Sequence, residues 1–159
     1  MFRVGIGWDQ HRMVEGRPLV LGGESFAHPR GLQGHSDADV LTHAVCDALL
    51  GALGLGDLGR WFPDDDPQHR NVESLGMLAQ VAEQMRARKL VVGNLDAVVI
   101  AQEPRLAGRL DAMCANLARV LGCPVASVNV KAASPEGIGG LGQGEGIAAH
   151  AVVLLEGRL

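Results

Sequence analysis

Residues 34–43 read Gly-His-Ser-Asp-Ala-Asp-Val-Leu-Thr-His, a stretch that holds two histidines and two carboxylates. Ser36 followed three residues later by Asp39 has the form of a capping box, so we predict that a helix begins here. The apolar residues that follow recur at helical spacing. They are Val40, Leu41, Ala44, Val45, Ala48 and Leu49. Free backbone N–H groups at a helix start attract anions, so this stretch indicates a phosphate site beside a possible metal ligand, His43.

The predicted helix carries three polar side chains on one face. Asp39, His43 and Asp47 are spaced four residues apart and therefore lie above one another. Asp47 sits in an otherwise apolar stretch, where a carboxylate is costly unless it is hydrogen-bonded or paired. It either orients a ligand histidine from behind or bonds a neighbouring backbone group, and the sequence leaves both open.

Composition indicates one globular domain spanning residues 1–159, with 47% hydrophobic and 20% charged residues. Only 3% of residues are aromatic, so the core must be built from Ala, Val and Leu. The formal charge of −4 and the lack of a Lys/Arg run argue against a nucleic-acid partner. We find no signal peptide, no membrane-length apolar run and no CxxC pair, which predicts a cytoplasmic protein with reduced thiols and no membrane contact.

A second pair of possible metal ligands follows the strand predicted over residues 2–8. Asp9 and His11 are two positions apart, and in extended backbone such side chains point the same way. The alternative is a polar turn after the strand. With His43 as a third ligand, the set of one carboxylate and two imidazoles is that of a zinc site with an open fourth position.

The remaining periodicity predicts elements in the order ββααβαββ. We expect the strand at 18–23 to form a hairpin with the first strand, helices at about 37–51, 73–89 and 104–121, and strands at 90–101, 126–132 and 147–155. Pro104 suits a first helical turn. Strand 90–101, its helix and strand 126–132 form a βαβ unit, so the two strands should be parallel. The order predicts an α+β fold: a mixed four- to five-stranded sheet with helices packed on one face, loosely ferredoxin-like.

The loops carry further candidates, each with a plain alternative. His35 is either a phosphate contact or a solvated loop histidine. Asp57 either bonds a hydroxylated ligand or caps a short helix. Residues 61–67 (Trp-Phe-Pro-Asp-Asp-Asp-Pro) form either a solvated turn or a stiff loop anchored over a ligand.

The glycine-rich loop at 133–146 contains Gly-Ile-Gly-Gly-Leu-Gly at 137–142, which has the GxGxxG spelling. A dinucleotide site requires that this pattern open a helix, whereas here it precedes a predicted strand, so we reject that interpretation. Ser134 and Glu136 are possible contacts to a phosphate and to a second metal ion, or ordinary loop residues.

Taken together, these motifs resemble the 2-C-methyl-D-erythritol 2,4-cyclodiphosphate synthase family. The resemblance runs from residue 4 to about 155. It rests on the stretches at 7–11, 34–43, 47–52, 56–59, 62–67, 94–105, 128–132 and 144–148. The pairing of Asp-x-His with His-Ser-Asp-x-Asp-Val-x-x-His is its most specific part.

The resemblance implies a reaction. The 2-phosphate of 4-CDP-2-C-methyl-D-erythritol 2-phosphate attacks the β-phosphate of the same molecule, expels CMP and closes a cyclic diphosphate, a step of the non-mevalonate isoprenoid route. The family is a homotrimer with active sites between subunits and the sheets facing the threefold axis. Phosphoryl transfer of this kind depends on positioning and charge neutralisation.

The resemblance also assigns residues. Asp9, His11 and His43 match zinc ligands, and Glu136 touches a second ion, magnesium or manganese. His35 and Ser134 match transition-state-stabilising positions, and Asp57 and Glu136 complete the implied catalytic set. The implied substrate-binding residues are Asp9, His11, His35, Ser36, Asp57, Leu58, Gly59, Phe62, Pro63, Asp64, Asp65, Asp66, Ala101, Gln102, Glu103, Pro104, Arg105, Leu106, Ala107, Ala133, Ser134, Pro135, Glu136, Gly140 and Gln143.

The chain departs from the family pattern in two places. Ala133 stands where threonine is frequent, and Gly140 and Gln143 replace a frequent phenylalanine and arginine near the trimer axis. Two other functions use the same ligands. One is a zinc phosphodiesterase that hydrolyses the CDP substrate to a linear product, and the other is a non-catalytic trimeric module whose metal is structural.

Overall fold

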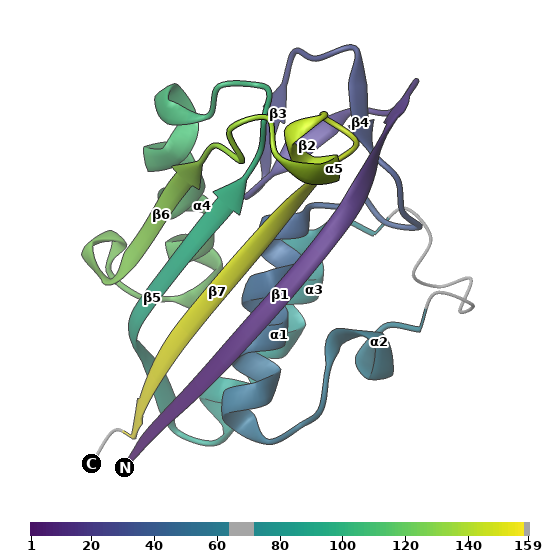
Figure 1. Ribbon diagram of the computed structural model, residues 1–159. Helices are drawn as coiled ribbons and strands as arrows, with labels where there is room; N and C mark the ends of the chain where they lie inside the picture. The colour runs from purple at the N-terminus through teal and green to yellow at the C-terminus, as the bar shows by residue number, and fades with distance from the viewer. Residues whose placement is uncertain (64–71, 158–159) are drawn as a thin grey trace.

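A computed structural model describes residues 1–63 and 72–157 of the chain, and a five-stranded sheet forms its front layer (Figure 1). The strands are β1 (Phe2–Glu15), β4 (Arg30–Leu32), β5 (Leu90–Ile100), β6 (Val128–Ala133) and β7 (Gly146–Gly157). Their order across the sheet is β4-β1-β7-β5-β6. Strands β5 and β6 are parallel and the other pairs antiparallel, which confirms the predicted mixed sheet and the βαβ unit.

Three helices cover one face of this sheet, as predicted (Figure 1). They are α1 (Val40–Leu53), α3 (Ser74–Ala87) and α4 (Leu110–Leu121). Four short helical segments lie in the loops between the main elements: α2 (Leu58–Trp61), α5 (Gly139–Gly142) and the 3₁₀ turns η2 (Ala107–Arg109) and η3 (Val125–Ser127). The core between helices and sheet is aliphatic, with Leu41, Leu49, Leu78, Leu95 and Leu117 fully buried. Within the described ranges, no helix is both long and apolar enough to cross a bilayer.

Strand β1 presents glycines to the helices and larger side chains to the open face. Gly5 and Gly7 are buried, and a Cβ at Gly7 would lie only 1.9 Å from the Ala44 carbonyl oxygen of α1. The backbone of α1 therefore rests directly on the backbone of β1. This close approach brings the start of α1, with His43, beside the middle of β1, with Asp9 and His11.

One prediction about connectivity was wrong. The strand at 18–23 does not pair with the first strand: β2 (Leu19–Leu21) turns back on β3 (Glu24–Phe26) in a separate two-stranded sheet. The reason is local, because Gly22 and Gly23 both adopt positive φ and permit a tight reversal. Strand β1 pairs instead with β7 and β4.

Two helix starts also differ from prediction. Helix α4 begins at Leu110, after η2, so Pro104 lies in the preceding loop and not in a first turn. Helix α1 begins at Val40 with Asp39 as its N-cap, so Ser36 is not the cap.

Candidate functional site

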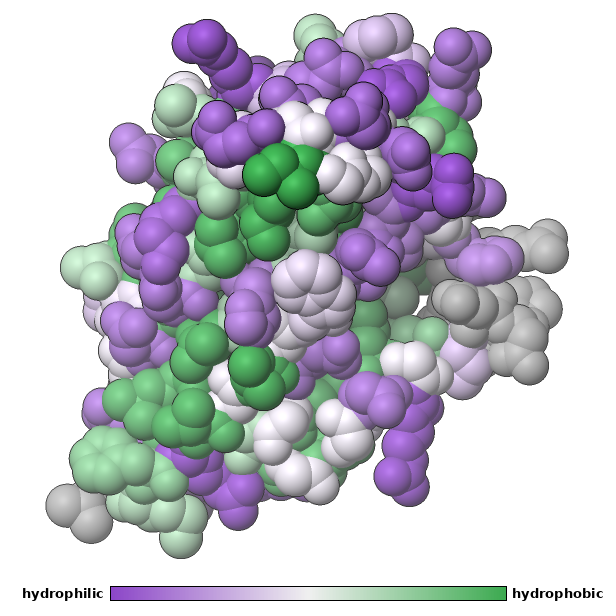
Figure 2. Space-filling model, in the orientation of Figure 1, coloured by the Kyte–Doolittle hydropathy of each residue, from purple (hydrophilic) through white to green (hydrophobic). Residues whose placement is uncertain are grey.

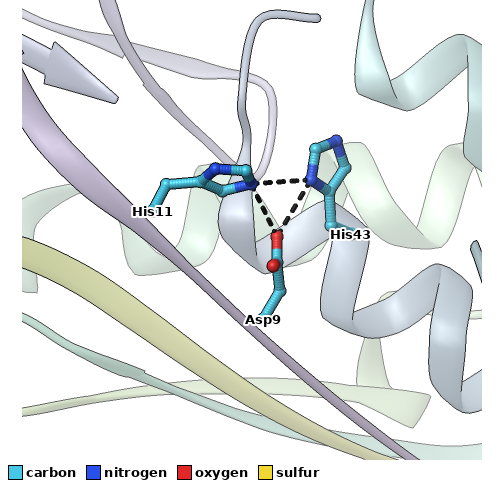
Figure 3. Close-up of side chains that lie close together, drawn as sticks. All are labelled: Asp9, His11 and His43. Atoms are coloured by element: carbon cyan, nitrogen blue, oxygen red, sulfur yellow. Dashed lines mark hydrogen bonds and ion pairs between the residues drawn. The ribbon is translucent and has the colours of Figure 1, made fainter. Parts of the chain in front are cut away.

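Three side chains from two elements converge beside the sheet (Figure 3). Asp9 and His11 project from the same side of β1, as their spacing predicted, and His43 projects from the first turn of α1. The Asp9 Oδ2 atom lies 2.9 Å from His11 Nε2 and 3.0 Å from His43 Nδ1. The two ring nitrogens are 3.3 Å apart. One carboxylate and two imidazoles meeting at one point are a donor set that fits a divalent metal ion.

The charge of this group suits a cation. Burial raises the pKa of Asp9, but hydrogen bonds and charges from His11 and His43 outweigh burial and hold that pKa below its usual value. Asp9 is therefore ionised at neutral pH, which is the form that binds a metal.

The two other carboxylates on the predicted helix face serve structure. Asp39 is fully buried and accepts hydrogen bonds from the backbone of Gly22, Gly23 and Thr42 and from the Thr42 hydroxyl. It joins the turn between β2 and β3 to the start of α1. Asp47 accepts a 2.6 Å hydrogen bond from the Leu58 backbone, the second of the two roles left open for it.

A pocket of about 260 Å³ opens over the metal-binding group. It brings together several residues that sequence reasoning had selected: His35, Ser36, Leu58, Gly59 and Phe62. His35 is exposed at its rim, whereas Ser36 is buried. Asp57 is exposed and caps α2 by accepting from the Arg60 backbone. Pro63 is exposed beside Phe62. Asp64, Asp65 and Asp66 lie outside the described residues.

A second pocket, of about 400 Å³, gathers most of the other selected residues. It is lined by Ala101, Gln102, Pro104, Arg105, Leu106, Ala107, Ala132, Ala133 and Ser134. Among the described residues, none lines both pockets. The metal-binding group and this second pocket are thus separate features of one chain.

The remaining selected residues lie around the second pocket and α5. Glu103 pairs with Arg30 at 2.9 Å. Pro135 is half-buried and Glu136 exposed, and the Glu136 backbone donates to the Ser134 hydroxyl. Gly140 is exposed in α5, and Gln143 donates to the Gly137 carbonyl.

Sequence reasoning missed two polar residues behind the candidate ligand His43. Ser74 Oγ lies 2.9 Å from His43 Nε2, and Asp37 contacts the same hydroxyl. No short-range pattern signals this contact, because Ser74 and His43 are 31 positions apart.

The fold and the site together define a class, an α+β metal-binding enzyme, because catalytic metal sites typically use three protein ligands beside a pocket. The sequence model of the YgbB family matches residues 2–156. The chain belongs to this family, that of the 2-C-methyl-D-erythritol 2,4-cyclodiphosphate synthases.

Individual relatives and solved structures agree with this family assignment. A 2-C-methyl-D-erythritol 2,4-cyclodiphosphate synthase of Pelobacter propionicus is 53% identical over 98% of this chain and 99% of its own length. A "Bifunctional enzyme IspD/IspF" of Desulforudis audaxviator is 58% identical over 96% of this chain, which spans only 39% of that protein. A CDP-bound structure of a 2C-methyl-D-erythritol-2,4-cyclodiphosphate synthase superposes with a TM-score of 0.88 at 36% identity, covering 97% of this chain and 100% of that one.

Proposed function

We propose that Asp9, His11 and His43 hold a zinc ion that serves the cyclisation catalysed by this chain. The reaction converts 4-CDP-2-C-methyl-D-erythritol 2-phosphate to 2-C-methyl-D-erythritol 2,4-cyclodiphosphate with release of CMP, in the non-mevalonate pathway. The observation that carries the proposal is the convergence of three ligand atoms under a pocket next to a helix start. When bound, the ion supplies a Lewis acid for a diphosphate oxygen.

The chain's own residues position the substrate and balance its charge. No protein nucleophile is required, because the attacking phosphate belongs to the substrate. His35 and Ser36 line the pocket immediately before α1, where a phosphate would meet them. Asp57 at the start of α2 is available to the erythritol hydroxyls. For Asp64, Asp65 and Asp66, the proposed role in substrate binding rests on the sequence alone.

The second pocket is the proposed nucleotide site. Its wall at 101–107 offers backbone groups to cytosine, with Arg105 near the diphosphate, and Ser134 stabilises the transition state. Glu136 would hold a second ion, magnesium or manganese, bound together with the diphosphate. Gly140 and Gln143 complete the implied set.

We propose that the working enzyme is a homotrimer whose active sites lie between subunits. Two observations support this. The metal pocket and the nucleotide pocket share no lining residue in one chain, which is what an active site shared between two copies predicts. The helix-free face of the sheet also exposes large apolar side chains among polar ones (Figure 2), including Phe2, Val4, Ile6 and Trp8. A single domain over residues 1–159 and a cytoplasmic location remain predictions from the sequence.

Phosphorus NMR of the product tests the proposed reaction. Incubation with the CDP substrate, zinc and magnesium should yield CMP and a cyclic diphosphate, which has no terminal phosphomonoester. A linear product would instead identify a phosphodiesterase.

The variant His43→Ala should lose both zinc and turnover while the oligomer persists. Retained turnover in the zinc-free variant would refute the metal assignment.

A further inference from the structure

We propose that Ser74, supported by Asp37, is a positioning residue that holds the ring of the metal ligand His43 in its metal-binding orientation. Neither residue belongs to the set that the family resemblance implies. The inference rests on the proposed metal site and adds to it the groups that orient one of its ligands.

The two nitrogens of the His43 ring face different partners. Nδ1 faces Asp9 and His11, at 3.0 and 3.3 Å. Nε2 faces the opposite way, toward Ser74 Oγ at 2.9 Å. Ser36 Oγ is a more distant neighbour of Nε2, at 3.3 Å, and it already accepts a hydrogen bond from the Ala38 backbone. Ser74 is therefore the nearest polar group to the nitrogen that points away from the metal position.

Asp37 holds Ser74 with two hydrogen bonds. One carboxylate oxygen accepts from the Ser74 hydroxyl, and the other accepts from the Ser74 backbone N–H at 3.0 Å. Ser74 is the first residue of α3, so the second bond also satisfies a backbone donor that the helix leaves unpaired. The side chain of Ser74 is thus fixed in direction by a carboxylate that precedes α1.

A metal ion at the point where Asp9 and His11 meet would take the Nδ1 lone pair of His43, which leaves the ring proton on Nε2. The Ser74 oxygen is placed to accept that proton, because a serine hydroxyl has a single proton of its own and donates it to Asp37.

Burial protects this contact. Ser74 has 0% of its surface exposed and His43 has 7%, so bulk water does not replace the serine hydroxyl. Groups that orient metal-bound histidines in this way typically change metal affinity or activity about 10–100-fold when they are removed.

The test replaces the hydroxyl alone. Ser74→Ala keeps the backbone N–H that donates to Asp37, so the start of α3 retains its cap. We expect zinc affinity, measured by competition with a chromophoric chelator in the absence of substrate, to fall about 10–100-fold. The matched control is Ser25→Ala, the same chemical change at an exposed position of β3, which should leave zinc affinity unchanged.

A second measurement reads the Ser74 contact directly. Proton–nitrogen NMR of the zinc-loaded, ¹⁵N-histidine-labelled chain, with the His43 signals identified by their absence from His43→Ala, should show an Nε2–H proton that exchanges slowly with water. Ser74→Ala should make this exchange faster. A structural role alone would lower thermal stability without moving either zinc affinity or the Nε2–H exchange rate.

The outcomes separate this inference from the proposed function. If the wild-type chain binds zinc and Ser74→Ala binds it equally well with Nε2–H still protected from exchange, the inference is overturned and the metal site stands. If the wild-type chain binds no zinc, the metal site fails and the inference that rests on it fails too. Should Ser74→Ala not fold, Asp37→Asn takes its place, and an unchanged zinc affinity and Nε2–H exchange rate there would overturn the inference.

Discussion

Substitution of Gly7 by alanine should disrupt the metal site from a distance, because α1 rests on this glycine. A Cβ at Gly7 would lie 1.9 Å from the Ala44 carbonyl oxygen and 2.7 Å from the Ala48 backbone nitrogen. Ordinary contact begins at 3.4 Å, so β1 and α1 must separate by roughly 1.5 Å at this point. Both obstacles are helix backbone, which cannot move aside as the end of a side chain can.

The separation acts directly on the ligands. Asp9 follows two residues after Gly7 on β1, and His43 precedes Ala44 on α1. Metal–ligand distances tolerate only about 0.2 Å, so a shift of roughly 1.5 Å removes one ligand from reach. We expect turnover to fall by about 100-fold or more, with a loss of zinc affinity, and overpacking to lower the unfolding free energy by about 1–3 kcal/mol.

Chelator competition for zinc and urea unfolding measure the two effects. The matched control is Gly51→Ala, within α1, where the added Cβ would lie 3.8 Å from the Ile6 carbonyl oxygen. Alanine should stabilise the helix there by about 0.5–1 kcal/mol and leave zinc binding intact. Wild-type zinc affinity and stability in Gly7→Ala would refute the view that direct backbone packing sets the ligand positions.

Three further outcomes are expected. The Arg17 guanidinium donates to the carbonyl oxygens of Gly34 at 2.8 Å and Ser36 at 2.6 Å, and lysine lacks this pair of parallel donors. Arg17→Lys should therefore raise KM for the CDP substrate several-fold in steady-state kinetics. An unchanged KM would contradict a role for Arg17 in holding residues 34–36, the proposed phosphate-binding segment. Removing the Asp39 carboxylate by Asp39→Ala leaves three backbone N–H groups without their acceptor, so urea unfolding should show a loss of about 3 kcal/mol, and a loss below about 1 kcal/mol would argue against this account. Free zinc at about 100 times its Kd should stabilise the wild-type chain by about 2.7 kcal/mol in thermal unfolding and leave His43→Ala unaffected, whereas equal stabilisation of both would place the zinc elsewhere.

The helix starts and turns show how far short-range patterns reach. The apolar spacing after Asp39 located α1, but the capping box assigned the wrong cap. The true cap, Asp39, satisfies donors from a turn 16 and 17 positions earlier as well as its own helix. A capping pattern scores only contacts within one helical turn, so it could not anticipate an acceptor shared with another segment.

The candidate site was likewise predicted only where it depends on neighbouring residues. The Asp-x-His spacing predicted that Asp9 and His11 would face one point, since side-chain direction in a strand depends only on the local backbone. That β1 should pair with β7, from the far end of the chain, was not predicted, and the nearer strand at 18–23 was expected instead.

The amino-acid sequence by itself determined the three long helices, four of the five strands of the main sheet, the candidate ligand types and the family, because periodicity, spacing and motif are properties of neighbouring residues. Only the tertiary structure decided that α1 approaches β1 through two glycines, that Asp39 and Asp47 accept hydrogen bonds from distant backbone N–H groups, and that Ser74 lies against Nε2 of His43. Each of these depends on atoms that are distant in the chain and adjacent in the packed molecule, where burial leaves a polar group few partners to choose from.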